Sequence, residues 1–442
     1  MNNSKLLILL FVLSTFLPGL AATSKSLAST ALANIRFGPY PPYVYPIRVG
    51  IAPHTALTHI YLWQPGAIFV DEKPVFALTA RQPYSIAHGR VTNLLGGENF
   101  VLPRDRRAYI ASYDPRNGYQ VWVNNRWYGG VLELISFGDR VTIINFLDLE
   151  DYLGGVVPAE MPASWHIEAL RAQAVAARSY AYAHTGPGSK WYREGFDVVP
   201  DTRDQVYKGQ AVATKSTNLA VLSTRGIILK DAGRVKPGFY RAWVGDPFEN
   251  LNIRHARVSK AVLEKITGVP NIIGVTIKEC DPNMNVRSIQ IIGTKKTCLV
   301  YGVALAKMLH FSTAGILDAK ESGNDWVFTY RGPGNGSLGL SQHGANMLAI
   351  NGWNCNQILQ QYYQDPDGKL RLDFMDRYKR PAWPVIRNKT AKSLDTTTET
   401  PDKTAKNRDT STETTDKTSK NLDTTTETLD NTKVQDKTSE NE

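Results

Sequence analysis

The sequence predicts an α+β protein with a β-rich N-terminal part and a mixed α/β second part that carries a long Ala-rich helix. Short runs of β-branched and aromatic residues alternate with turn residues over 34–146. A strongly helical segment then begins near residue 165. The 442 residues, 42% of them hydrophobic, suffice for one large or two to three ordinary domains.

The first 33 residues have the features of a signal peptide and leader. One lysine precedes an apolar run, Leu6–Leu17, which is shorter than the roughly 20 residues of a transmembrane helix. Pro18-Gly19 and small residues follow it, so cleavage is expected after Ala21, after Ala22 or within 31–33. We therefore expect export to the periplasm, cell wall or medium. The alternative is a buried N-terminal helix or an uncleaved anchor.

Within 34–146, the runs IRVGI, HIYLW, AIFV, PVFALT, AYIASY, YQVWV, RWYGGVLELI and VTIINF predict strands. A hairpin is predicted at 121–128, around Asn124-Asn125-Arg126. Trp122 and Trp127 lie on either side of this turn. They either form a platform on which sugars stack or, as is more common, pack in the core.

The region 147–365 opens with the predicted helix at 165–184, capped by Ser164 and stopped by Gly186-Pro187. Its apolar stripe has a period of 3.6 residues, and it contains Ile167, Leu170, Ala174, Ala177 and Ala181. Arg171 and Arg178 project within about 20° of each other at the edge of that stripe. They either reach into a cleft, or they are solvated or pair with Glu168.

Glu160 lies between Pro158 and Pro162, just before that helix. The prolines favour extended conformations at Val157 and Met161, which predicts a stiff turn. A rigid carboxyl near a helix N-terminus is suited to acid–base chemistry. The helix dipole and the two arginines would lower its pKa, and an apolar wall would raise it. The alternative is a capping or surface glutamate.

Two further segments concentrate polar side chains, the loop at 201–209 and the Gly-rich stretch at 332–345. The second lacks the Gly-Lys-Ser/Thr of a phosphate-binding loop. It is not a nucleophile elbow either, because His343 follows Gln342 where the second glycine of that motif belongs.

Charge and cysteines narrow the chemistry further. The chain carries +10 in total, and because the segment 389–442 contributes −3 by our count, the rest carries +13, which favours polyanionic partners. No common nucleic-acid-binding motif is found. No cysteine spacing is typical of a zinc site, and we expect a disulfide between Cys280 and Cys298.

After a connecting segment at 366–388, the tail at 389–442 consists of 14-residue near-repeats rich in Thr, Asp, Lys and Glu, which predicts disorder.

Three segments taken in order, LEDYLGGVVPAEMPASWHIEALRAQAVAARSYA, DTRDQVYKG and GLSQHGANMLAINGWNCNQILQQYY, resemble the stage II sporulation protein D and amidase-enhancer (SpoIID/LytB) family. The resemblance covers about 47–365 and implies an exported envelope protein. The sporulation branch includes lytic transglycosylases, which cut glycan strands between N-acetylmuramic acid and N-acetylglucosamine. The other branch is named for stimulating a peptidoglycan amidase.

The resemblance implies catalytic roles for Glu160 and Arg178, with a substrate cleft around them. We expect Glu160 to act as general acid and then base, and Arg178, with Arg171, to hold substrate and tune the pKa of Glu160. The cleft is expected to be lined by Gln205, Tyr207, Ser341 and Gln342. The expected partners are peptidoglycan glycan strands, with no cofactor and no metal. The alternative is a wall-binding protein without catalysis that activates a cell-wall amidase as its partner.

The sequence departs from the family at two places. Asn335-Gly336-Ser337 stands where the family commonly has Gly-His-Gly. Residues 236–243 occupy the region where a Ser-Ser-Gly-Gly-like stretch is often found. Any role of those family groups is therefore not carried over to this chain.

Overall fold

A computed structural model describes residues 44–114, 118–249, 251–332, 334, 338–364 and 368–376. All described residues belong to one compact unit, which lies within Met1–Thr390. The predicted leader and the low-complexity tail lie outside the described residues, as do Asn335, Gly336 and Ser337.

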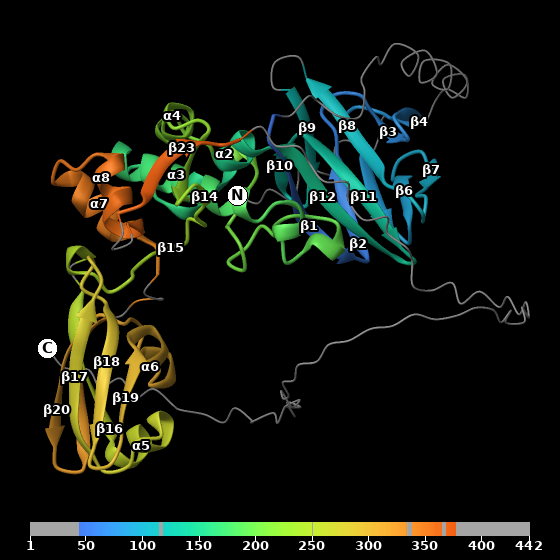
Figure 1. Ribbon diagram of the computed structural model, residues 1–442. Coiled ribbons are helices and arrows are strands. Elements are labelled where there is room, and N and C mark those ends of the chain that lie inside the picture. The colour runs from blue at the N-terminus through green and yellow to red at the C-terminus, as the bar shows by residue number, and fades with distance from the viewer. Residues whose placement is uncertain are drawn as a thin grey trace, which may run out of the picture. The chain divides into compact units, whose positions relative to one another are not determined.

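The N-terminal part is β-rich, as predicted (Figure 1). Its strands pair antiparallel in the order β1-β12-β11-β8-β9-β2-β5-β6-β7, with β10 beside β9, and β3 between β4 and β8. Residues alternate between faces, and the inward side chains form the largest hydrophobic core together with the following helices. The strands are β1 (Pro46–Thr55), β2 (Leu57–Tyr61), β3 (Gly66–Val70), β4 (Lys73–Leu78), β5 (Pro83–Ala87), β6 (Arg90–Asn93), β7 (Asn99–Val101), β8 (Ala108–Asp114), β9 (Gly118–Val123), β10 (Arg126–Gly129), β11 (Val131–Phe137) and β12 (Arg140–Asp148).

The predicted hairpin is the β9–β10 pair. Val123 pairs with Arg126, so the turn contains only Asn124 and Asn125. Both have positive φ, 44° and 70°, the left-handed conformation that a two-residue turn of type I′ requires and that Asn tolerates. Trp127 on β10 is half-buried, and its ring meets that of Tyr61 edge to face at 6.4 Å.

The helices that follow β12 pack around one central helix, α3 (Ile167–Ala183). Its small alanines allow close approach from several sides, and it contacts α2, α4, α7, α8 and β13. The expected single apolar stripe was too narrow, because the helix is buried on nearly all sides. The elements of this region are α2 (Leu149–Glu160), η1 (Gly186–Gly188), η2 (Tyr192–Glu194), η3 (Gln210–Val212), α4 (Lys215–Ser223), β13 (Ile227–Asp231), β14 (Arg234–Val235), β15 (Tyr240–Arg241), η4 (Pro247–Glu249), β22 (Leu340–Ser341), α7 (Gln342–Ile350), α8 (Cys355–Tyr363) and β23 (Leu370–Phe374).

Two local predictions around α3 were wrong. The cap is His166, whose ring nitrogen accepts the Glu168 N–H, so Ser164 does not cap the helix. Pro158 lies inside α2, so Val157 is helical and not extended. Pro158 has no N–H, so the helical bond from its position to the Gly154 carbonyl is absent, and α2 continues for only two more residues.

A third part, 252–332, has a hydrophobic core of its own. It consists of two three-stranded antiparallel sheets, β16-β21-β20 and β17-β18-β19, and two short helices. Figure 1 shows it in yellow and orange. Its elements are β16 (Asn252–Ser259), α5 (Lys260–Thr267), β17 (Ile272–Cys280), β18 (Val286–Gly293), β19 (Thr297–Tyr301), α6 (Gly302–Met308), β20 (Ile316–Ser322) and β21 (Asp325–Gly332).

The expected disulfide between Cys280 and Cys298 is not present, and both thiols are free. Cys280 lies on β17 and Cys298 on β19, with β18 between them. Two strand spacings amount to roughly 9–10 Å, beyond the roughly 7 Å that a disulfide can bridge between Cα atoms.

Thiol labelling tests this arrangement. We expect all three cysteines to react in denatured, non-reduced protein, with or without prior reduction. In the native protein Cys280 should react fastest because it is exposed. Cys355 should react slowly, because burial raises the pKa of its thiol to about 12 and leaves little thiolate. Two cysteines that react only after reduction would contradict the structure.

Candidate active site

Glu160 is the last residue of α2, and this helix is fixed at both ends. Asp148 caps its start by accepting the Glu150 N–H at 3.0 Å. Near the other end, Gly155 packs against the loop 201–209 so closely that a Cβ there would lie 2.5 Å from the Gly209 carbonyl oxygen. At Met161 the chain turns to extended backbone. The glutamate is thus held at a defined point, at the C-terminus of α2 and not at the N-terminus of α3.

Three groups hold the half-buried carboxyl of Glu160. The Val206 N–H donates to Oε1 at 2.6 Å. The Tyr240 hydroxyl and the Gln342 side chain also form hydrogen bonds to the carboxyl. Gln342 binds this turn a second time, since its Nε2 donates to the Glu160 backbone carbonyl at 3.2 Å.

Burial raises the pKa of the Glu160 carboxyl above its usual value. The hydrogen bonds from Val206, Tyr240 and Gln342, and the nearby Lys208, lower it in part. The expected lowering by a helix dipole was wrong in sign. Because Glu160 lies at the negative end of α2, the dipole disfavours its charged form. The site therefore favours a carboxyl that can be protonated.

Tyr240 is positioned by Gln205 through a chain of hydrogen bonds. The Gln205 Nε2 donates to the Tyr240 hydroxyl at 3.1 Å and to the Ala177 carbonyl at 3.2 Å. Its Oε1 accepts from the Tyr152 hydroxyl at 3.2 Å. Because the Tyr240 oxygen accepts from Gln205, its own proton is available to Glu160. Burial also raises the pKa of Tyr240, so it stays protonated.

Gln342 is oriented by the start of α7. Ser341 caps that helix by accepting the Gly344 N–H at 3.0 Å, and it is fully buried. The Gln342 side chain also donates to Gln173 Oε1 on α3 at 3.4 Å. Of this predicted pair, Gln342 contacts Glu160, whereas Ser341 acts through the backbone that carries Gln342.

The structure does not bring Arg178 to Glu160. Arg178 is completely buried and makes a two-pronged ion pair with Glu150, at 2.8 and 2.7 Å. Its remaining hydrogen bonds end on the Ala174, Val221 and Ile227 carbonyls and on the Thr224 hydroxyl. All three guanidinium nitrogens are thereby used, so the expectation that Arg178 holds substrate is corrected to a role in fixing α2 against α3.

Arg171 and Tyr207, which were also expected at the substrate cleft, have other partners. Arg171 pairs with Glu168 and donates to the Ser223 hydroxyl at 3.0 Å, which is the alternative that its spacing left open. Tyr207 is fully buried, and its hydroxyl donates to Asn145 at 2.8 Å. Tyr207 therefore packs the loop 201–209 against β12 and does not line a cleft.

Sequence reasoning missed Tyr240 and an aromatic cluster next to Gln342. The His343 ring stacks on Trp243 at 4.3 Å and meets Trp165 edge to face at 4.8 Å. These residues come from three distant segments, which no short motif joins. The available signal was the aromatic content of 236–243, where the family's usual stretch is replaced.

Within the described ranges, no group of three or more His, Cys, Asp and Glu side chains is arranged to hold a metal ion. None of the helices in those ranges is long and apolar enough to cross a bilayer.

A known protein family matches the part of the chain that contains Glu160. The family described as Stage II sporulation protein (SpoIID) matches residues 138–230, which contain β12, α2, α3 and the loop 201–209. This match confirms the predicted resemblance to the SpoIID/LytB family over this region. The SpoIID match thus includes Glu160 and the Val206 N–H that binds it.

Three proteins are similar to parts of this chain. The stage II sporulation protein D of Bacillus subtilis is 29% identical over 276 residues, which are 52% of this chain and 77% of that protein. The amidase enhancer of B. subtilis is 37% identical over 141 residues, covering 31% of this chain. An uncharacterised protein of Brachyspira hyodysenteriae is 37% identical over 142 residues, again 31% of this chain. The matches span only 18% of the amidase enhancer and 38% of the Brachyspira protein.

The buried Arg178–Glu150 pair predicts a stability effect. Arg178→Lys keeps the charge but loses most of the hydrogen bonds of the planar guanidinium. We expect the free energy of unfolding to fall by roughly 2–4 kcal/mol, measured by urea denaturation. Arg171→Lys, at a half-exposed pair, is the matched control and should change it by under about 1 kcal/mol. If the free energy of unfolding of Arg178→Lys is unchanged but cleavage of glycan strands is lost, Arg178 acts on substrate.

Proposed function

We propose that this SpoIID-family protein is a peptidoglycan lytic transglycosylase that uses Glu160 as both acid and base. The observation that carries the proposal is the half-buried carboxyl of Glu160, whose pKa is raised by burial and whose position is fixed by Tyr240, Gln342 and Val206. A carboxyl that stays protonated closer to neutral pH can protonate a leaving oxygen.

The reaction requires two proton transfers at one carboxyl. Glu160 first donates its proton to the glycosidic oxygen, and the bond from that oxygen to C1 of N-acetylmuramic acid breaks. The resulting carboxylate then takes the proton of the C6 hydroxyl of the same sugar, and O6 bonds to C1. The products are a 1,6-anhydro end and a new N-acetylglucosamine hydroxyl, so protons balance without water.

A single carboxyl suits this chemistry better than ordinary hydrolysis. Glycoside hydrolases usually place two carboxyl groups about 5–10 Å apart, one of which activates water or attacks the sugar. The described groups that act most strongly on the Glu160 carboxyl are Val206, Tyr240, Gln342 and Lys208, and none of them is a second carboxylate. Tyr240, Gln342 and the Val206 N–H are neutral donors, which can stabilise the carboxylate that forms after the first transfer.

The substrate class also fits the proposed place of action. The N-terminal run Leu6–Leu17 favours export, and the basic balance outside the tail favours the anionic polymers of a cell wall. We therefore include an exported location in the proposal. Proteinase accessibility on intact cells, with a cytoplasmic protein as control, measures it directly.

A second candidate function is activation of a cell-wall amidase without glycan cleavage. The specific observation is the 37% identity to the amidase enhancer of B. subtilis over 141 residues. This function does not require Glu160 to change its protonation state, which separates the two candidates.

Glu160→Gln is the decisive substitution. Glutamine keeps the shape and can still accept the Val206 N–H, but it cannot supply a proton. We expect release of glycan fragments with 1,6-anhydro ends to fall by at least roughly 10²–10⁴-fold, while the melting temperature changes little. Mass spectrometry of products from purified glycan strands gives the rate and the chemistry of the new end.

Glu194→Gln is the matched control, because Glu194 is a half-exposed glutamate paired with His54. It should cleave like the wild type. Reducing ends in place of 1,6-anhydro ends would mean that water attacks. If wild-type protein releases no fragments but accelerates an amidase, and Glu160→Gln does so equally, the activator function is correct.

The raised pKa of Glu160 predicts the pH profile. The protonated form is the active acid, so kcat/KM should be highest below the pKa of Glu160 and decline as pH rises through it. Tyr240→Phe removes a hydrogen bond that lowers this pKa, so the decline should move to higher pH. Tyr182→Phe, on α3, should leave the profile in place. A decline that moves to lower pH in Tyr240→Phe would contradict this assignment.

A further inference from the structure

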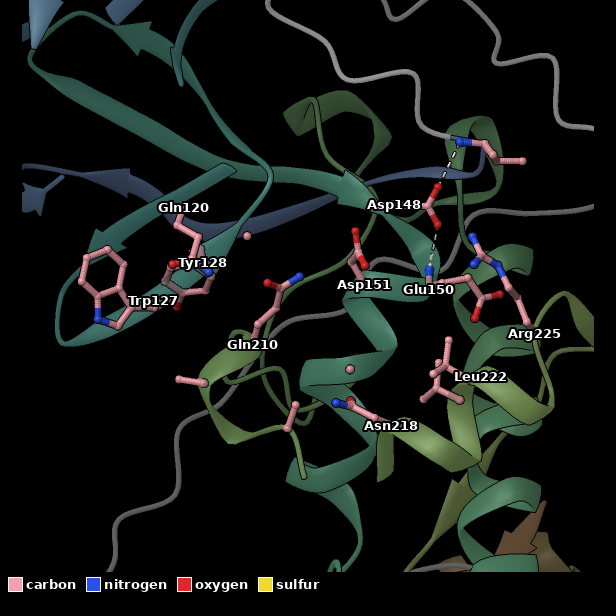
Figure 2. A pocket seen from close by; sticks show the side chains of 16 residues that line it. Gln120, Trp127, Tyr128, Asp148, Glu150, Asp151, Gln210, Asn218, Leu222 and Arg225 are labelled. Carbon is pink, nitrogen blue, oxygen red and sulfur yellow. Dashed lines mark hydrogen bonds between the residues drawn. The ribbon is translucent and has the colours of Figure 1, made fainter. Parts of the chain in front are cut away.

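A concave region lies at the other end of α2 from Glu160. A cavity of about 850 Å³ opens between the β9–β10 hairpin, the first turns of α2, and α4 (Figure 2). Trp127 borders it on the side of the sheet, and Asp151 on the side of the helices. Neither the Glu160 carboxyl nor its three partners are among the residues that line it.

The side chains around this cavity carry unused hydrogen-bonding capacity. Within the described ranges, the side-chain amides of Gln210 and Asn218 form no hydrogen bonds, and Arg225 forms no ion pair. Figure 2 shows Gln210, Asn218 and Asp151 around the same opening. Together these groups offer donors and acceptors in one place.

This combination matches a saccharide better than an anion or an apolar ligand. Sugar hydroxyl and acetamido groups pair with amides and carboxylates, and the C–H face of a pyranose ring packs on an indole such as Trp127. Asp148, Glu150 and Asp151 also line the cavity, whereas Arg225 is the one basic residue among the described lining residues. That balance disfavours a phosphate or another strongly anionic group.

The loop 206–210 joins this cavity to Glu160. Its Val206 N–H binds the Glu160 carboxyl, and its Gln210 side chain lines the cavity. Between them, Gly209 has φ of 73° and packs on Trp127, where a Cβ would lie 2.2 Å from the Trp127 carbonyl oxygen. The loop therefore fixes Trp127 and Glu160 relative to each other.

Helix α2 gives the separation between the two sites. Asp151 and Glu160 are nine residues apart on this helix, which corresponds to roughly 14 Å along its axis. A polymer can reach both ends of such a helix, whereas one sugar unit cannot.

We infer that the cavity beside Trp127 is a binding subsite for N-acetylated sugar units of the glycan strand, remote from the bond that Glu160 cleaves. The inference rests on the proposed function in taking a glycan strand as the ligand. Trp127 supplies the stacking surface, and Gln210, Asn218 and Asp151 bind the polar groups of the sugar. The subsite would hold a strand while a distant linkage is cut.

Calorimetric titration tests the subsite apart from catalysis. The full chain carrying Glu160→Gln is titrated with a tetramer of β-1,4-linked N-acetylglucosamine, which it cannot cleave by the proposed chemistry. Trp127→Ala, added to this background, should raise Kd about tenfold, the loss that corresponds to one stacking contact of about 1.4 kcal/mol. Asn218→Ala and Gln210→Ala should each raise Kd several-fold.

Trp63→Ala is the matched control, because Trp63 is 46% exposed on the same β-rich part and does not line the cavity. It should leave Kd unchanged. If Trp127→Ala does not fold by its melting curve, Trp127→Phe and the exposed Asn218→Ala carry the test. An unchanged Kd in the folded cavity variants, or no tetramer binding at all, overturns the inference. Binding of a sugar-free stem peptide to the cavity, blocked by Asn218→Ala, also overturns it.

The subsite and the proposed function can fail independently of each other. If wild-type protein yields no 1,6-anhydro ends but tetramer binding depends on Trp127, the transglycosylase proposal fails and the subsite stands. If cleavage depends on Glu160 but Kd is insensitive to the cavity variants, the subsite fails and the proposed function stands.

Discussion

The buried ion pair between Arg178 and Glu150 is the constraint on which the rest of the site depends. It connects the start of α2 to the middle of α3, and the same guanidinium binds carbonyls at the end of α4 and the start of β13. Burying two charges is costly, and the cost is offset only where geometry is good and every donor is used. Arg178 meets that condition. Because α2 is thereby fixed at one end, the carboxyl at its other end has a defined place.

Uncharged hydrogen-bonding groups hold the Glu160 carboxyl at the end of that fixed helix. Tyr152, Gln205 and Tyr240 form a chain that ends on the carboxyl, and Gln342 approaches from α7. Neutral donors lower the pKa of a buried carboxyl only in part, whereas an adjacent guanidinium would lower it much further. Because Arg178 is bound to Glu150 and not to Glu160, burial can keep the pKa of the Glu160 carboxyl raised.

The fold class could be predicted because it depends on local patterns. The alternation of β-branched residues predicted the strands. The Asn124-Asn125 turn predicted the hairpin, and the alanine content predicted α3. Glu160, Gln205 and Gln342 were found at the site through the resemblance to a family. What could not be predicted depends on partners far along the chain. Arg178 was expected in a cleft because spacing does not reveal Glu150 as its partner, and Tyr240 was missed because its contact with Glu160 spans eighty residues.

The register of β16 and β21 has a consequence for the chain's architecture. Asn252 pairs with Gly332, so the strands that enter and leave 252–332 lie side by side. The segment starts and ends at one point and has its own hydrophobic core. It can therefore change in length or sequence without moving the strand pair β15–β22. The region therefore has the geometry of an exchangeable module, whose length and sequence can diverge while the surroundings of Glu160 keep their structure.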